Sequence, residues 1–221
     1  NVKPDAPVVL KVEHLNVGNT VKDVSFELRK GEILGFSGLM GAGRTETARA
    51  IFGADRRDSG DIYVNGKRVD IKNPQDAVDA GIGYLSEDRK RYGVIIEKTV
   101  AENTTMASLK AFCKGLFIDK KAEKETAEQY VEALKTKTPS VEQQVRNLSG
   151  GNQQKVVLAK WLDRNPQVLI LNEPTRGVDV GAKSEIYRLI DDLANNNLAI
   201  LFITVELPEV MGVSDTITVM C

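Results

Sequence analysis

The sequence has few of the residues that build metal centres and disulfide frameworks. It contains one histidine, His14, and two cysteines, Cys113 and Cys221, which lie far apart and form no Cys-x-x-Cys or Cys/His cluster. Neither a zinc site nor a disulfide scaffold is therefore expected, and this cysteine usage fits the reducing cytosol best. We expect His14, near the amino end, at the surface or at a sheet edge.

The chain also lacks an excess of either charge and any long apolar run. Its 30 basic and 31 acidic residues leave a formal net charge of -1 at pH 7, so no global field would draw it onto nucleic acid or an anionic membrane. The longest apolar runs, such as 198–205, have the length of buried strands and fall short of the ~20 residues that a membrane helix needs. We predict a soluble chain that recognises its partners locally.

With 221 residues, 42% of them hydrophobic, the chain is long enough for one compact domain with a small inserted lobe. It begins with asparagine instead of methionine and ends directly after a strand-like run at 216–220. We therefore expect one domain of a longer protein.

Short β-branched runs alternate with helical ones along most of the chain. Apolar runs separated by helical segments favour an α/β fold with a parallel sheet and crossover helices, whereas the first ~70 residues, with a hairpin-like Asn-Gly-Lys at 65–67, look antiparallel. Strands are expected at 8–12, 33–36, 62–64, 82–85, 168–171, 200–204 and 217–219, and helices include 45–52 and 183–194.

The pattern changes between 99 and 139, where a charged amphipathic segment, KKAEKETAEQYVEALK, occurs. Its charged face is most simply a solvated one. We predict a helical subdomain at 99–147, inserted in an α/β core made of 1–98 and 148–221, of which the amino-terminal part is a β-subdomain.

A phosphate-binding loop is indicated directly after the strand at 33–36. The segment GLMGAGRTE fits the pattern G-x-x-x-x-G-K-[ST] except that Arg44 replaces lysine. Its glycines let backbone N–H groups turn toward an anion, the helix beginning near Arg44 adds its positive end, and Thr45 stands where a hydroxyl would bind Mg²⁺. A glycine-rich turn without a ligand is the alternative. The predicted nucleotide-binding residues are Gly38, Leu39, Met40, Gly41, Ala42, Gly43, Arg44, Thr45 and Glu46.

Arg44 is expected to affect catalysis more than binding. Lysine inserts a compact charge between the β- and γ-phosphates, whereas guanidinium is a wide planar fork. Charge that develops on the transferred phosphoryl group must be met by preorganised donors, so misplacing this cation costs transition-state stabilisation first.

An acidic strand end follows about 130 residues later. The apolar run 168–171 leads into Asn172 and Glu173, which resembles a Walker B strand. Glu173 is a candidate general base toward water, or alternatively a carboxylate that caps the exit of the strand. Asn172 stands where a carboxylate usually serves the metal, and its neutral amide offers a weaker oxygen ligand.

The segment LSGGNQQK, residues 148–155, resembles the signature sequence of ABC ATPases. Together with NEPTRGVDVGAKSEIY it is similar to the second, C-terminal ATP-binding half of bacterial sugar importers of the ribose/galactose/xylose class. GFSGLMGAGRTE, GYLSEDRKRYG and VELPEVMGVSD extend the resemblance over essentially the whole chain. It implies a P-loop NTPase of the ABC-ATPase fold, with 1–221 as a single nucleotide-binding domain.

In that family two such domains lie head to tail, and each signature contacts the ATP of the other domain. The resemblance therefore gives Ser149, Gly150 and Gly151 a catalytic role in a partner's site. A serine followed by two glycines at a helix start is also, physically, a donor-lined anion site. Trp161, further along the same helix, is expected to pack in the core.

Two more positions depart from an active enzyme of this family. Glu87 occupies the place of a glutamine that faces magnesium and water, and Val205 the place of a switch histidine. The metal candidates implied are Thr45, Glu87 and Asn172. With Arg44 and Asn172, these departures predict an asymmetric pair in which this chain's own site is degenerate while its signature completes a productive site elsewhere.

The function implied is ATP binding and hydrolysis that powers import of a monosaccharide, with ATP and Mg²⁺ as cofactors and low activity of this half alone. The partners implied are a first ATP-binding half, expected on the same polypeptide, membrane permease subunits and, indirectly, a sugar-binding protein, at the cytoplasmic face of the cell membrane.

Two alternatives stay open. One is a soluble ABC protein without a transport role, acting on ribosomes or DNA or binding ATP as a regulator, and the other is a structural half without nucleotide. The only dense basic cluster, residues 89–91, belongs to the family resemblance, so nucleic acid is not expected as a partner.

Overall fold

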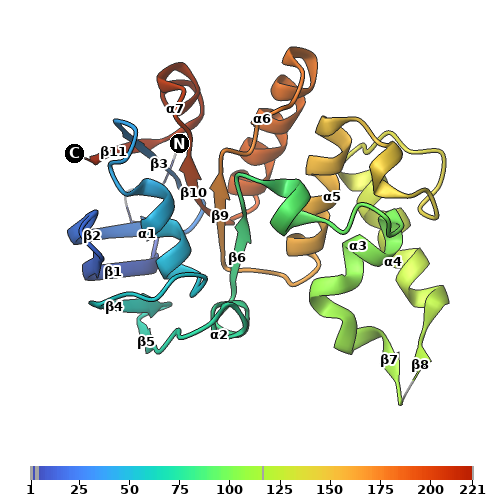
Figure 1. The fold of residues 1–221 in the computed structure, drawn as a ribbon, viewed down its shortest axis with the longest axis horizontal. Coiled ribbons are helices and arrows are strands. Elements are labelled where there is room, and N and C mark those ends of the chain that lie inside the picture. Colours follow the sequence, from blue (N-terminus) through green and yellow to red (C-terminus); the bar gives the residue numbers. More distant parts are fainter. Residues whose placement is uncertain (1, 3–4, 116, 221) are drawn as a thin grey trace. The chain divides into compact units, whose positions relative to one another are not determined.

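The computed structural model describes residues 2, 5–115 and 117–220. It divides into two compact units, shown in Figure 1. The sheet unit comprises residues 1–84, 166–174 and 187–221, and the helical unit comprises 85–165 and 175–186. Among the described residues, no helix is both long and apolar enough to span a bilayer.

The sheet unit begins with a four-stranded antiparallel sheet in the order β2-β1-β4-β5. Its strands are β1 (Val8–Val17), β2 (Val21–Arg29), β4 (Ser59–Val64) and β5 (Lys67–Val69). Asn65 and Gly66, both at positive φ, make the tight turn between β4 and β5. The expected antiparallel start and its hairpin are confirmed.

A five-stranded sheet in the order β11-β3-β10-β9-β6 forms the rest of the unit's core. Its strands are β3 (Ile33–Gly38), β6 (Ile82–Leu85), β9 (Val168–Asn172), β10 (Ala199–Ile203) and β11 (Thr216–Met220). β10 pairs in parallel with β3 and β9, and β11 with β3. Every residue of β9 and β10 is buried, which explains their continuous apolar runs. Because the strands are parallel, β3, β9 and β10 end at the same edge.

Helices α1 (Arg44–Ile51), α2 (Pro74–Asp79) and α7 (Leu207–Val213) belong to the sheet unit. α1 contacts β1, β3 and β9, and α7 contacts β3. Helix α6 (Val180–Asn195) buries Ile186, Ile190 and Ala194, which recur at helical spacing. It begins at Val180, before the expected residue 183, and the Asp179 side chain accepts the backbone N–H of Ala182 at 2.9 Å at this start.

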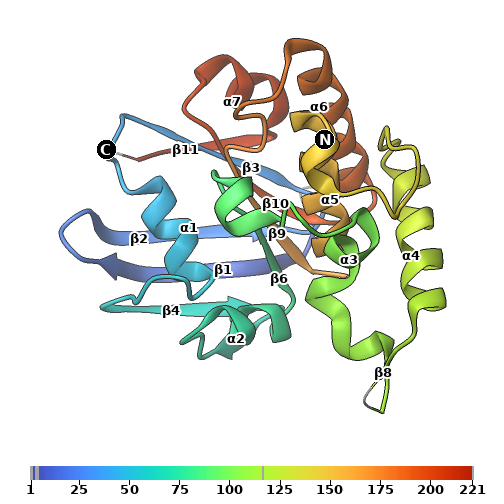
Figure 2. The ribbon, with the colours of Figure 1, turned by 45° about the vertical axis from the view of Figure 1, so that its right-hand side comes forward.

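The helical unit contains α3 (Val100–Thr105), α4 (Lys120–Ala133) and α5 (Gly150–Leu162), with short turns η1 (Arg89–Gly93), η2 (Met106–Phe112) and η3 (Val145–Asn147) and a small hairpin of β7 (Cys113–Lys114) and β8 (Phe117–Ile118). α3 packs against α4 and α5 (Figure 2).

Trp161 is buried, as expected, and His14 of β1 is exposed and paired with Asp23. Cys113 is free and exposed, and Cys221 lies outside the described residues.

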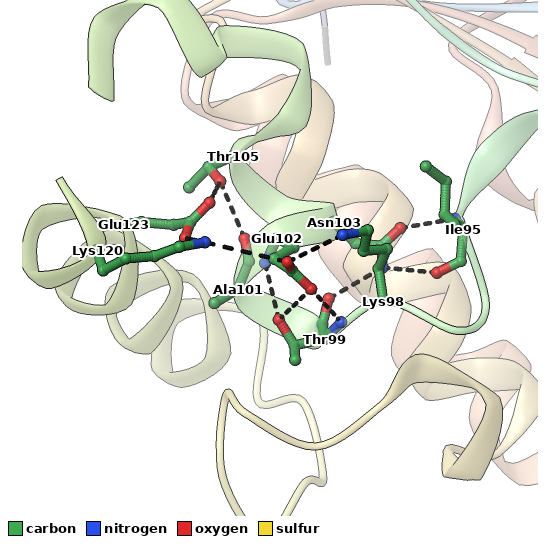
Figure 3. Close-up of polar contacts among 9 residues, drawn as sticks. All are labelled: Ile95, Lys98, Thr99, Ala101, Glu102, Asn103, Thr105, Lys120 and Glu123. Atoms are coloured by element: carbon green, nitrogen blue, oxygen red, sulfur yellow. Dashed lines mark hydrogen bonds and ion pairs between the residues drawn. The ribbon is translucent and has the colours of Figure 1, made fainter. Parts of the chain in front are cut away.

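A polar cluster, drawn in Figure 3, fixes the segment that leads into α3. Thr99 and Glu102 form a reciprocal capping box at the helix start. The fully buried Asn103 accepts a hydrogen bond from the backbone N–H of Ile95 at 2.8 Å and donates one to its carbonyl at 2.9 Å. Glu123, buried on α4, accepts hydrogen bonds from a threonine and a lysine. Hydrogen bonds therefore tie residues 95–99 to α3 and tie α3 to α4.

Candidate functional site

The predicted phosphate loop joins β3 to α1, as the spacing of its residues predicts. Gly43 is the N-cap of α1 at φ +83°, and no side chain caps the helix, so its first N–H groups are left for an anion. A Cβ on Gly43 would lie 2.9 Å from Val21 Cγ2, so only glycine fits there. Leu39 and Met40 are 81% and 93% exposed.

Arg44, at the first position of α1, is buried at 7% exposure. Its Nη1 donates a hydrogen bond to the carbonyl oxygen of Thr204 at 2.8 Å. Thr204 follows β10 directly, so the guanidinium joins the loop to the end of the neighbouring strand. Guanidinium has five donors, so this bond to backbone leaves capacity to serve a phosphate.

Asn172, the last residue of β9, reaches the phosphate loop. Its Nδ2 donates to Thr45 Oγ1 and to the Tyr84 hydroxyl, each at 3.2 Å. Its Oδ1 is buried and has no hydrogen-bond partner among the described residues. A buried, unsatisfied acceptor beside a hydroxyl is a place where a bound cation or water would supply the missing partner. The two oxygens that could bind a cation here, the Asn172 amide oxygen and the Thr45 hydroxyl, carry no charge.

Glu173 follows at the same edge, with its backbone at φ +52°. Its Oε1 accepts the backbone N–H of Val205 at 2.8 Å, and Oε2 accepts the Thr204 hydroxyl at 3.3 Å. Partial burial raises the pKa of the Glu173 carboxyl, opposed by these two hydrogen bonds and by the charge of Arg44. A half-buried carboxyl with a raised pKa suits proton transfer to or from water. Val205 itself offers only an apolar, exposed side chain here.

The signature turn, defined as Ser149–Gly151, lies in the helical unit at the start of α5. Ser149 is the N-cap but makes no side-chain cap; its Oγ accepts a hydrogen bond from Asn152 Nδ2 at 2.9 Å. A Cβ on Gly150 would lie 2.6 Å from the Gly177 carbonyl oxygen, and one on Gly151 would lie 2.7 Å from the Cβ of Ala182. Both glycines are therefore required by packing, and the helix amides are not used by the Ser149 side chain.

A cavity of about 260 Å³ opens at this turn, and its lining combines the signature turn with charged side chains. Among the lining residues are Ser149, Gly151, Lys155 and Asp179. Lys155 is 2% exposed and donates to Glu185 Oε2 at 2.7 Å and to the Lys135 carbonyl at 3.0 Å, so its charge is already neutralised.

Glu87 also belongs to the helical unit, where its carboxylate pairs with Arg176 Nη1 at 3.3 Å. A neighbour that sequence reasoning missed, Arg89, donates from Nη1 to the Arg176 carbonyl and from Nη2 to the Gly177 carbonyl, at 2.7 and 3.1 Å. Only its membership of a basic cluster could have drawn attention to Arg89.

The predicted residues thus fall into two groups. Arg44, Thr45, Asn172 and Glu173 come together at one edge of the parallel sheet, with the backbone of Val205. The signature turn and Glu87 lie in the helical unit.

Comparison with known proteins bears on this arrangement. The family model for ABC transporters matches residues 21–176. A putative ribose/galactose/methyl galactoside import ATP-binding protein of Burkholderia lata is 56% identical over 215 residues, which are 97% of this chain and 42% of that protein. The ribose import ATP-binding protein RbsA of Bacillus licheniformis is 50% identical over 96% of this chain and 43% of its own length. The chain therefore spans about two fifths of these relatives.

Solved structures share the fold at lower identity. A nucleotide-free ATP-binding cassette from an ABC transporter has a TM-score of 0.81 at 23% identity and covers 96% of this chain and 87% of its own. The cbiO1 protein of Clostridium perfringens, described as part of the ABC transporter complex cbiONQ, has a TM-score of 0.79 at 22% identity, over 97% of this chain and 85% of that one.

Proposed function

This chain belongs to the ABC transporter family, and from that premise we propose that it is the second ATP-binding domain of a monosaccharide importer of the ribose/galactose/xylose type. The substrate class comes from relatives at 50–56% identity, whose names state ribose or galactoside import. The observation that carries ATP binding is the glycine-lined loop ahead of α1, where no side chain caps the helix and its first N–H groups are left to meet phosphates.

Its own nucleotide site is proposed to bind ATP with little turnover. The guanidinium of Arg44 gives one of its donors to the Thr204 carbonyl, which restrains how it can approach a γ-phosphate, and Val205 contributes no polar side chain toward that phosphate. Glu173 is the proposed base, accepting a proton from water at the carboxylate that the Val205 N–H orients. The backbone of the whole loop, Gly38 to Glu46, is proposed to cradle the phosphates.

Magnesium is the second proposed cofactor, and the residues at β9 fit it weakly. Thr45 Oγ1 and Asn172 Oδ1, which has no hydrogen-bond partner among the described residues, would hold it in the sheet unit. Glu87, the third candidate ligand, is paired with Arg176 within the helical unit. When bound, the ion would neutralise charge on the β- and γ-phosphates. Without a carboxylate in place of Asn172, the site is expected to hold the ion loosely.

The catalytic contribution of the chain is proposed to be its signature turn. Ser149, Gly150 and Gly151 would offer hydroxyl and backbone donors to the ATP held by a first ATP-binding half, which we propose lies on the same polypeptide. Permease subunits in the cell membrane, supplied by a sugar-binding protein, complete the proposed assembly at its cytoplasmic face. The length of the relatives, more than twice that of this chain, supports a polypeptide with two halves.

The test compares ATP turnover of the isolated chain with that of the protein carrying both halves. Ser149→Arg should abolish turnover in the two-half protein, and Ser140→Arg, a matched change at an exposed serine of the same unit, should leave it unchanged. Appreciable turnover by the isolated chain, or full activity of the Ser149→Arg protein, would contradict the asymmetric assignment. Turnover stimulated by ribosomes, and not by a permease, would favour a non-transport role.

A further inference from the structure

The side chains of Glu87 and Arg89 contact the turn at 176–177, a segment of the helical unit that is far away in sequence. Glu87 forms an ion pair with Arg176 at 3.3 Å. Arg89 donates one hydrogen bond to each of two consecutive carbonyls, those of Arg176 and Gly177. The turn at 176–177 is therefore held by three contacts from one short segment.

Arg89 contributes most to this arrangement. It is half-buried, and burial lowers the pKa of its guanidinium, yet arginine stays charged at any physiological pH. Its charge faces two backbone carbonyls, and its Nε also approaches Gln153 Oε1 of α5 at 3.4 Å. The Glu87–Arg176 pair has side chains that are 43% and 64% exposed, so solvent screens it and it adds less.

The same guanidinium lies directly behind the signature turn. A Cβ on Gly150 would be 2.7 Å from Arg89 Nη2 and 2.6 Å from the Gly177 carbonyl oxygen. The backbone of Gly150 thus packs against the Arg89 guanidinium and against the Gly177 carbonyl, which accepts a hydrogen bond from Arg89. Moving the guanidinium would change the position of the donors that Ser149–Gly151 present.

The segment that carries Arg89 is itself anchored at its far end. Lys160 of α5 donates to the Gly93 carbonyl at 2.6 Å. Asn103 of α3 holds both backbone groups of Ile95, as Figure 3 shows. The segment that carries Arg89 is therefore held by hydrogen bonds to α3 and α5.

We propose that Arg89, assisted by Glu87, is a positioning residue that sets the geometry of the signature turn for the ATP of a facing domain. The proposal rests on the proposed function of that turn. It also gives Glu87 a minor role that a neutral glutamine would fill less well, because only a carboxylate forms an ion pair with Arg176. Neither residue needs to contact the nucleotide.

The experiment measures steady-state ATP turnover of the two-half protein with Arg89→Ala, Arg89→Lys and Glu87→Gln. Arg89→Ala should lower kcat about tenfold or more with KM for ATP nearly unchanged, because the lost geometry acts in the transition state. Arg89→Lys should recover little, since an ammonium cannot serve both carbonyls in a fork. Glu87→Gln should lower kcat by about twofold to threefold. Arg91→Ala, at an exposed arginine of the same turn, is the matched control and should behave as wild type.

Chemical rescue separates positioning from simple loss of fold. Methylguanidinium should restore turnover to Arg89→Ala and leave Arg89→Lys and the control unaffected. Hydrogen exchange at the amides of Gly150 and Gly177 should accelerate in Arg89→Ala while α3 stays protected.

The outcomes also separate this proposal from the proposed function. If Ser149→Arg abolishes turnover while Arg89→Ala keeps wild-type kcat and exchange rates, the positioning role is wrong and the signature assignment survives. If Ser149→Arg is itself fully active, the proposed function fails first. Uniformly faster exchange in Arg89→Ala with no rescue by methylguanidinium would overturn the proposal in favour of a purely structural arginine.

Discussion

Arg44 and Thr204 are joined by a hydrogen bond of 2.8 Å from Nη1 to the carbonyl oxygen. The bond links the first residue of α1 to the residue after β10, so the cation is shared between the phosphate loop and the loop that contains Val205. A lysine has no planar fork to hold a carbonyl with one arm and a phosphate with another. In this site the arginine thus has a structural task besides any contact with nucleotide.

Arg44→Lys should strengthen binding of ATP relative to ADP by about tenfold, because a compact ammonium released from Thr204 can reach a γ-phosphate. Hydrolysis by the isolated chain should stay low, since Asn172 and Val205 are unchanged. Titration with fluorescent ATP and ADP analogues measures the ratio, with Arg56→Lys at an exposed position as the control. An unchanged ratio, or turnover restored by this single change, would refute the reasoning.

Asn172→Asp should make the fold depend on magnesium. The side chain at 172 is fully buried, and a carboxylate there without a cation should lower the free energy of unfolding by about 1–3 kcal/mol. Mg²⁺ with ATP should recover this loss, whereas the wild type should respond less. Denaturant unfolding in ATP with EDTA and in ATP with Mg²⁺ measures both, and Asn147→Asp, at an exposed site, should show neither effect. Equal stability of the Asn172→Asp variant in both buffers would contradict a metal site at this position.

The buried strands and the loops that follow them could be predicted from the sequence because their signals are local. The apolar run at 168–171 and the glycine pattern at 38–46 each indicate their element without reference to the rest of the chain, and the structure has both. β2 has no such run: Val24, Phe26 and Leu28, buried or half-buried, alternate with exposed Ser25 and Glu27. This alternation is typical of a strand with one buried face, but the strands expected from apolar runs do not include it.

The contacts that define the candidate site depend on distant residues and leave no local pattern. Asn172 is recognisable in the sequence as a departure from a family motif, but its bonds to Thr45 and Tyr84 require β9, α1 and β6 to be assembled. The two carbonyls held by Arg89 are likewise backbone atoms, which carry no sequence signature.

Gly41 and Gly43 allow a matched test of the phosphate loop. Both have positive φ, +85° and +83°, so alanine is strained at each by a similar amount. A Cβ at 41 meets no atom within 4 Å, whereas one at 43 lies 2.9 Å from Val21 Cγ2 and 3.2 Å from the Thr20 carbonyl. Gly43→Ala should therefore lower the free energy of unfolding by about 1–3 kcal/mol more than Gly41→Ala. Equal losses in chemical denaturation would mean that the loop moves away from Val21 at little cost.

The buried Lys160 should make the free energy of unfolding depend on pH in the alkaline range. It is buried, and burial lowers the pKa of its ammonium from 10.5 to about 8. Between these values the unfolded chain holds a proton that the folded chain has released, so the free energy of unfolding should rise with pH from about 8 to 10.5. The full gain is on the order of 3 kcal/mol.

Lys160→Met should remove that rise. The variant loses the hydrogen bond to Gly93, which costs about 1–2 kcal/mol, but it also loses the penalty of a buried charge on the order of 3 kcal/mol, so it should be slightly more stable than wild type at pH 7. Urea unfolding between pH 7 and 10.5 measures both, with Lys121→Met, at an exposed lysine of α4, retaining the wild-type slope. If the free energy of unfolding of Lys160→Met changes with pH as it does in wild type, the buried ammonium keeps its ordinary pKa. The hydrogen bond to the Gly93 carbonyl would then have to offset the cost of desolvating the charge.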